Sequence, residues 1–233
     1  MNATNVVINA KDSAEIASNI TANNNVNITA GNGVTFTESA NTASNQGTAV
    51  NVGIGAGTTI NVETGVAVPH VNGSVGVNKT DNASSTATGA NVAAGNDIKI
   101  NANNGDVNLH GTNLVSNNSV EVEGNKVNTS GAISSVNEKN LTVNVNGSYA
   151  SGKPDGGINA KGKNEANVTN TANTIQSDNV VITTGSPTGL SVNNTTINGN
   201  NVAYYYDDSK APATNRYTYR PRQPNYAKRR LRY

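Results

Sequence analysis

The fold is decided by residues 91–129, which read NVAAGNDIKINANNGDVNLHGTNLVSNNSVEVEGNKVNT. Apolar residues fall here in short triplets in which two branched side chains flank one polar residue, the alternation of a half-buried β-strand. A shift of 22 residues places Ile98 on Val120. A shift of 20 residues places Val107 on Val127. The stretch is therefore a repeat of short strands.

The same unit occurs earlier in the chain. Residues 20–30 (ITANNNVNITA) align without a gap on residues 92–102 (VAAGNDIKINA). A period of roughly 20–22 residues with three short strands is typical of a solenoid, in which one coil buries its apolar side chains only against its neighbours. We expect an all-β fold, a parallel β-helix. Its core is expected to contain Val92, Ile98, Ile100, Val107, Leu109, Leu114, Val120, Val122 and Val127.

Asparagine makes up about a fifth of the chain, and valine and isoleucine dominate its apolar residues. Branched residues favour strands, whereas Asn and Gly tolerate the left-handed backbone of sharp corners. Stacked asparagines can also form side-chain amide ladders between coils. The composition thus fits stacked β-coils and opposes helices.

Further triplets extend the pattern through the chain, at residues 6–8, 50–52, 60–62, 141–145 and 180–182. Read as coils, they give about ten levels and a rod about 50 Å long at the usual strand spacing of about 4.8 Å. Two stretches interrupt the pattern. Residues 63–79 are expected to form a β-excursion, with the Ser/Thr-rich 80–89 as a loop or corner. Residues 146–174 are expected to be irregular, with a turn at 153–157.

The chain divides by composition into residues 1–202, the expected β-helix, and a tail, 203–233. The first part has eight Lys, no Arg and thirteen Asp or Glu, whereas the tail has eight Lys or Arg and two Asp. The tail also contains seven of the eight tyrosines and three prolines. We expect it to be disordered. Although Tyr and Arg alternate in it, no nucleic-acid partner is expected.

No cysteine is present, so disulfides and thiolate metal sites are excluded. His70 and His110 are the two histidines, and 40 residues separate them. A metal site built on so few ligands is not expected. No cofactor motif is found, and neither a signal peptide nor a transmembrane run is visible.

Enzymes that cleave polysaccharides also use β-helices, and they need clustered carboxylates to move protons. The densest acidic group consists of Asp97, Asp106, Glu121 and Glu123. Because Glu121 and Glu123 flank Val122, both should point outward, and a solvated face is the expected role. An acidic groove that binds cations is the alternative. We expect no catalytic residues and no enzyme activity.

Residues 89–115, GANVAAGNDIKINANNGDVNLHGTNLV, resemble the repeat of filamentous haemagglutinins, and residues 75–86 resemble that family's long inserted hairpin. The resemblance is good over about 50–129 and looser up to about 202. It implies a right-handed parallel β-helix. It also implies a secreted or surface-exposed bacterial exoprotein, exported by two-partner secretion through an outer-membrane β-barrel.

On that resemblance the chain is expected to be a structural and adhesive shaft segment that mediates cell contact. Its expected partners are neighbouring coils of a longer exoprotein, the outer-membrane transporter, and a receptor or glycan on a host or bacterial cell. Two alternatives stay open. One is a toxin-delivery segment in contact-dependent growth inhibition, and the other is a polysaccharide-cleaving β-helix enzyme.

Overall fold

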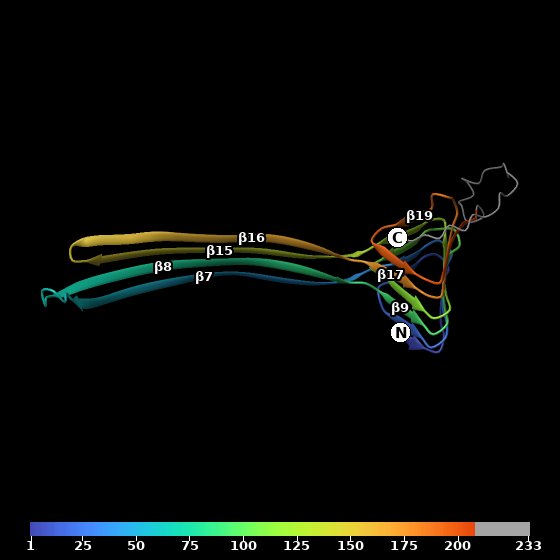
Figure 1. Ribbon diagram of the computed structural model, residues 1–233, viewed down its shortest axis with the longest axis horizontal. Helices are drawn as coiled ribbons and strands as arrows, with labels where there is room; N and C mark the ends of the chain where they lie inside the picture. Colours follow the sequence, from blue (N-terminus) through green and yellow to red (C-terminus); the bar gives the residue numbers. More distant parts are fainter. Residues whose placement is uncertain (208–233) are drawn as a thin grey trace. The chain divides into compact units, whose positions relative to one another are not determined.

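The computed structural model describes residues 1–207, in which all regular elements are β-strands (Figure 1). The chain forms two units. The first, here called the β-helix, comprises Met1–Asn41, Thr86–Ser134 and the described residues from Thr169 onward. The second, here called the hairpin sheet, comprises Thr42–Ser85 and Ser135–Val168. Most of the expected tail, residues 208–233, lies outside the described residues.

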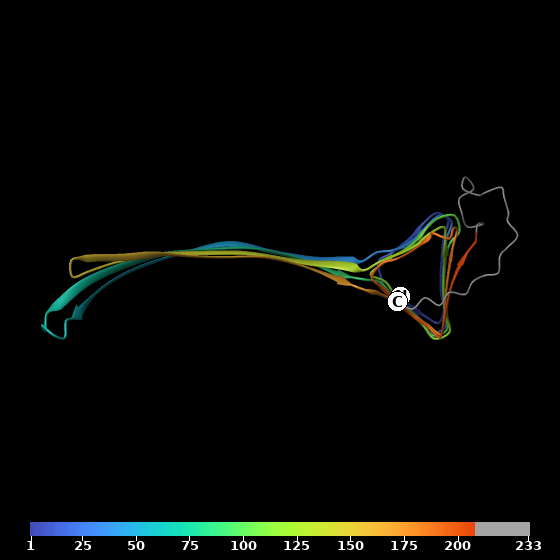
Figure 2. The same ribbon diagram turned by 45° about the horizontal axis from the view of Figure 1, so that its top comes forward.

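Three parallel sheets, A, B and C, make up the β-helix (Figure 2). In stacking order, sheet A contains β1 (Asn2–Ala3), β4 (Ile20–Ala22), β9 (Asn91–Ala94), β12 (Asn113–Ser116), β17 (Asn173–Gln176) and β20 (Thr195–Asn198). Sheet B contains β2 (Val6–Ala10), β5 (Val26–Ala30), β10 (Asp97–Ala102), β13 (Ser119–Gly124), β18 (Asn179–Thr184) and β21 (Asn201–Tyr206). Sheet C contains β3 (Ala14–Ile16), β6 (Val34–Phe36), β11 (Val107–His110), β14 (Val127–Ser130) and β19 (Leu190–Val192).

The register of these sheets follows the sequence repeat. Ile98 pairs with Val120 on one side and with Val26 on the other, all in parallel strands. In sheet C, Val107 pairs with Val127. The predicted repeat and the parallel β-helix are therefore confirmed.

Aliphatic side chains from all three sheets fill the core. The side chains expected there are fully buried: Val92, Ile98, Ile100, Val107, Leu109, Leu114, Val120, Val122 and Val127. Phe36 is buried among them and stacks in register on Leu109. Each coil buries its apolar side chains against the coils above and below, which is how a solenoid gains stability.

Polar side chains link neighbouring coils, and glycine allows a tight corner. The predicted amide ladders are present: Asn128 Nδ2 donates to Asn108 Oδ1 at 2.9 Å, and Asn201 Nδ2 donates to Asn179 Oδ1 at 3.0 Å. Gly111 has a left-handed backbone (φ 57°), which a side chain would strain. The Asn-rich composition thus serves contacts between coils.

The hairpin sheet is antiparallel and four strands wide, in the order β16-β15-β8-β7. Two long hairpins supply its strands: β7 (Ser39–Ile60) with β8 (Ala67–Thr88), and β15 (Ala132–Ala150) with β16 (Lys153–Thr171). The chain enters the first hairpin after β6 and the second after β14. Ser151 (φ 54°) and Gly152 (φ 77°) make the tight second turn, because a type I′ turn requires positive φ at both central residues.

Several sequence-based expectations were wrong here. The triplets at 50–52 and 141–145 lie in hairpin strands, and 60–62 lies at the end of β7 and in its turn. Sheet B accordingly has six strands, not about ten levels. The excursion begins at Ser39, residues 80–88 continue β8, and the second turn is at 151–152. The last strand, β21, continues to Tyr206, past the expected boundary at 202.

Candidate functional site

The two faces of the hairpin sheet differ in polarity, because successive side chains of a strand point to opposite sides. Asn51, Gly76 and Asn144 lie together on one face, from β7, β8 and β15. On the same face, Lys163 Nζ contacts Glu138 Oε2 and Glu165 Oε2, both at 2.7 Å. These two hydrogen bonds raise the pKa of Lys163, and the bond with Glu138 has the larger effect. We call this side the polar face.

The opposite side is here called the apolar face. Val75 and Val145 are paired on β8 and β15. The register of β7 on β8 follows from two hydrogen bonds: Gln46 Nε2 donates to Asp81 Oδ1 at 2.9 Å, and the Asn61 N–H donates to the Val66 carbonyl at 3.0 Å. This register places Val52 opposite Val75. The large apolar side chains of this face are Val50, Val52, Ile54, Ile60, Val71, Val75, Val77, Leu141, Val143, Val145, Tyr149, Ile158 and Val168.

In the part of the chain that the structure describes, no other element packs on these apolar side chains. Ile54 is 85% exposed, Ile158 76% and Val52 67%. The charged side chains on this face, within residues 1–207, are Lys79, Asp81 and Lys139. Asp81 pairs directly with Lys139 across the strands. The charged side chains of the apolar face thus lie together at Lys79, Asp81 and Lys139. Between them and the hairpin turns, the large side chains of this face are apolar.

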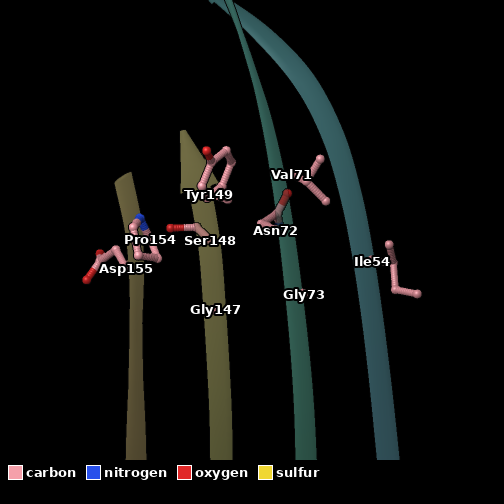
Figure 3. A pocket seen from close by; sticks show the side chains of 9 residues that line it. All are labelled: Ile54, Val71, Asn72, Gly73, Gly147, Ser148, Tyr149, Pro154 and Asp155. Atoms are coloured by element: carbon pink, nitrogen blue, oxygen red, sulfur yellow. The ribbon is translucent and has the colours of Figure 1, made fainter. Parts of the chain in front are cut away.

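A shallow depression lies close to those turns (Figure 3). Its apolar lining comes from Ile54, Val71, Tyr149 and Pro154. Asn72, Ser148 and Asp155 also line it. The side chain of Asp155 alternates with that of Pro154 and so belongs to the polar face, and the lining residues provide no paired donor and acceptor of the kind that acid–base chemistry needs.

The acidic residues of the β-helix bond to neighbouring coils. Asp97 Oδ1 accepts hydrogen bonds from Asn118 Nδ2 and Ser119 Oγ, both at 2.7 Å. Glu121 forms an ion pair with Lys99 at 3.1 Å, and this hydrogen bond is the main cause that raises the pKa of Lys99.

Asp106 Oδ1 accepts from the Lys126 N–H at 3.2 Å. Glu123 lies on the outer side of β13, next to buried Val122. Across residues 1–207, no three His, Cys, Asp or Glu side chains are grouped as a metal site would need. Asp97, Asp106 and Glu121 therefore act as links between coils.

The histidines belong to different strands. His70 lies in β8 of the hairpin sheet, and His110 lies in β11 of the β-helix. His110 Nδ1 is 2.5 Å from Ser130 Oγ, a contact between adjacent coils. For residues 1–207, no helix is long and apolar enough to span a membrane.

Asn173 is a buried polar residue that sequence reasoning missed. It follows the second hairpin at the start of β17, and its side chain is fully buried. Its Oδ1 accepts from the Thr112 N–H at 2.6 Å, while its Nδ2 donates to the Ser130 carbonyl at 2.9 Å and to Thr195 Oγ1 at 3.0 Å. Nothing in the repeat distinguishes it from the many surface asparagines. Asn173 thus anchors the start of β17 to the neighbouring coils, at the point where the chain returns from the second hairpin to the β-helix.

Stacked coils interrupted by long hairpins define a class: a segment of a repeat-built β-helical protein. The family model described as hemagglutinin repeat matches residues 71–203, more than half of the chain. The chain therefore belongs to the hemagglutinin repeat family, and the resemblance drawn from residues 89–115 is confirmed. Neither the curated proteins nor the solved structures include a match to it.

Proposed function

We propose that the chain is a structural and adhesive shaft segment of a secreted bacterial surface exoprotein. The observation that carries this proposal is the combination of two features: a β-helix with a packed core, and a broad sheet whose apolar face is exposed to solvent among residues 1–207. The hemagglutinin repeat family supports an adhesin segment.

The β-helix is the shaft in this proposal. Among the described residues, β2 and β21 are the outermost strands of sheet B, and each has a partner on one side. Outer strands with free backbone groups accept further strands readily. Neighbouring coils of a longer exoprotein are thus the proposed partners at both ends. Export by two-partner secretion through an outer-membrane transporter is part of the same proposal.

The hairpin sheet is the proposed contact element. Its strands are 19–22 residues long, so its faces offer a large surface. Broad shape complementarity to a receptor or glycan on another cell would carry the binding, as in protein interfaces that bury large areas without a deep pocket. The polar face, rich in Asn, Ser and Thr, suits hydrogen bonding to a glycan.

The test compares the full chain with a variant in which residues 42–85 and 135–168 are each replaced by Asn-Gly. Beads coated with either protein are mixed with epithelial cells and with bacterial cells, and bound beads are counted. The proposal predicts that the full chain binds one cell type and that the shortened chain loses most of that binding. Equal binding by both proteins, or none by a folded full chain, would contradict it.

A further inference from the structure

We infer that the apolar face of the hairpin sheet is a self-association surface, on which the same face of a second copy of this chain packs. This inference goes beyond the proposed function, since two copies can associate whether or not the chain binds another cell. It rests on the exposed side chains, the distribution of charge and the size of the face.

The side chains of this face are those of a buried sheet. Val52, Val75 and Val145 lie in register across three strands, the arrangement found inside β-sandwiches. Each is more than 40% exposed: 67% for Val52, 43% for Val75 and 42% for Val145. Single-domain proteins seldom leave a contiguous apolar patch of more than about 300–600 Å² in water. The composition and exposure of this face are therefore those of a surface that a partner buries.

The whole face is larger than the area that a standard interface buries on each partner, and its uncharged portion is somewhat smaller. Strands of 19–22 residues, four side by side, give a face of roughly 65 Å by 19 Å, or about 1,200 Å². The portion free of charge is about half of this by the same dimensions. A standard interface buries about 800 Å² per partner. Two such sheets can pack face to face at a separation of about 10 Å.

The distribution of charge favours a copy of the same face as the partner. From Val50, Val77 and Val143 to the turns, the apolar face carries no charged side chain within the described range. Over the same levels the polar face has Lys153 and Asp155. A second copy offers an equally apolar, uncharged surface, and a twofold axis would bring the two together with like residues exchanged.

A lipid surface fits less well. Elements that lie on membranes combine apolar residues with flanking cations and several aromatic rings. On this face Tyr149 is the single aromatic side chain in residues 1–207, and Lys139 lies opposite Asp81. The chemistry therefore points to a protein surface of the same kind.

The test is sedimentation equilibrium of the full chain, with two variants of neighbouring positions on β7. Val52→Lys puts a charge on the apolar face, and Asn51→Lys puts the same charge on the polar face of the same edge strand. Wild type is expected to dimerise at micromolar concentration. Val52→Lys should raise the dissociation constant at least about 30-fold, the scale of an interface hot spot, and Asn51→Lys should leave it unchanged.

A second measurement avoids any folding defect of the lysine variants. The chain has no cysteine, so Ile54→Cys and Asn51→Cys each carry one thiol. Reaction of the Ile54→Cys thiol with a maleimide should slow as protein concentration rises, whereas that of Asn51→Cys should not.

Three results would overturn the inference. One is a wild type that is folded but monomeric at about 100 μM, a concentration well above the micromolar dissociation constant expected of such an area. A monomeric wild type that binds phosphatidylcholine vesicles would overturn the inference in the same way. Another is equal loss of the dimer in both lysine variants, which would indicate pairing of β7 edges. The last is a dimer that neither variant weakens, which would place the contact on the β-helix.

Discussion

The β-helix and the hairpin sheet are built from the same alternating sequence pattern, yet they bury it very differently. Ile100 in β10 is fully buried, whereas Ile54 in β7 is 85% exposed. Three sheets close around the first side chain, and a single sheet displays the second. Alternation thus sets which face a side chain joins, while closure of the coil decides whether that face is buried.

One chain thus combines a packed solenoid with a sheet whose apolar face is exposed. The β-helix gains its stability from aliphatic burial, amounting to about 25 cal/mol for each Å² of apolar surface removed from water. The hairpin sheet relies mainly on its backbone ladder and cross-strand pairs. Its exposed apolar face is then available for a partner.

The largest effect should come from removing a side chain of the core. Ile100→Ala is expected to lower the free energy of unfolding by about 2–5 kcal/mol, because it deletes buried methyl groups and leaves a cavity. Ile54→Ala, the matched change on the hairpin sheet, should cost no more than about 0.5 kcal/mol in the monomer. Urea denaturation below the dimerising concentration measures both. Similar losses for the two variants would show that the contrast between the regions is wrong.

A smaller loss is expected for Asn173→Ala. The substitution removes the acceptor for the buried Thr112 N–H, and it also removes a donor to the Ser130 carbonyl, which keeps its hydrogen bond from the Gly111 N–H. The expected cost is about 1–3 kcal/mol. Asn201→Ala is the control, since that exposed side chain donates one hydrogen bond to Asn179. If the two variants unfold at the same urea concentration, Asn173 does not fasten the coil.

Removing the hairpin sheet should change the stability of the β-helix by less. The two units are compact in themselves, so the shortened chain keeps most of the internal contacts of the β-helix. The variant with residues 42–85 and 135–168 replaced by Asn-Gly should keep its β-helix. Far-UV circular dichroism on heating should show an unfolding midpoint within a few degrees of wild type, about 4 °C per kcal/mol. Loss of the transition would mean that the β-helix needs the hairpins.

The smallest effect concerns Lys99. Its ion pair with Glu121 raises the folded-state pKa above 10.5, so the stabilisation is complete below that pH and is lost as the pH rises through the folded pKa. Both side chains are partly exposed, at 46% and 40%, so the contribution should stay below about 0.5 kcal/mol. The difference in stability between wild type and Lys99→Gln should be constant from pH 7 to 9 and should shrink above about pH 10.5. A difference that grows at high pH would contradict this.

The sequence predicted the coil register well, because a repeat records which residues stack. Ile20 pairs with Val92, as the gapless alignment of the two segments requires. It could not separate coil strands from hairpin strands, since residues 50–52 and 141–145 alternate in the same way as 98–100. An apolar side chain is buried only where the three sheets of the β-helix enclose it. The alternating pattern does not show at which residue the chain leaves the β-helix to form a hairpin.

The apolar face could not be derived from the sequence for a related reason. Its side chains come from four strands, and the pairing of Val145 with Val75 joins two hairpins that are far apart in the chain. No repeat links these segments, so no shift of the sequence aligns them. Only the pairing of β8 with β15 brings the valines onto one surface.

The most direct test of the central claim is hydrogen exchange, followed by mass spectrometry, on the full chain at a concentration below dimerisation. Exchange reports the free energy of local opening, which is highest where strands are buried. The account predicts the slowest exchange in peptides that cover β10 and β13, and much faster exchange in peptides from the edge strands β7 and β16. Equal protection in the two regions would contradict it, because the hairpin sheet would then be as tightly packed as the β-helix.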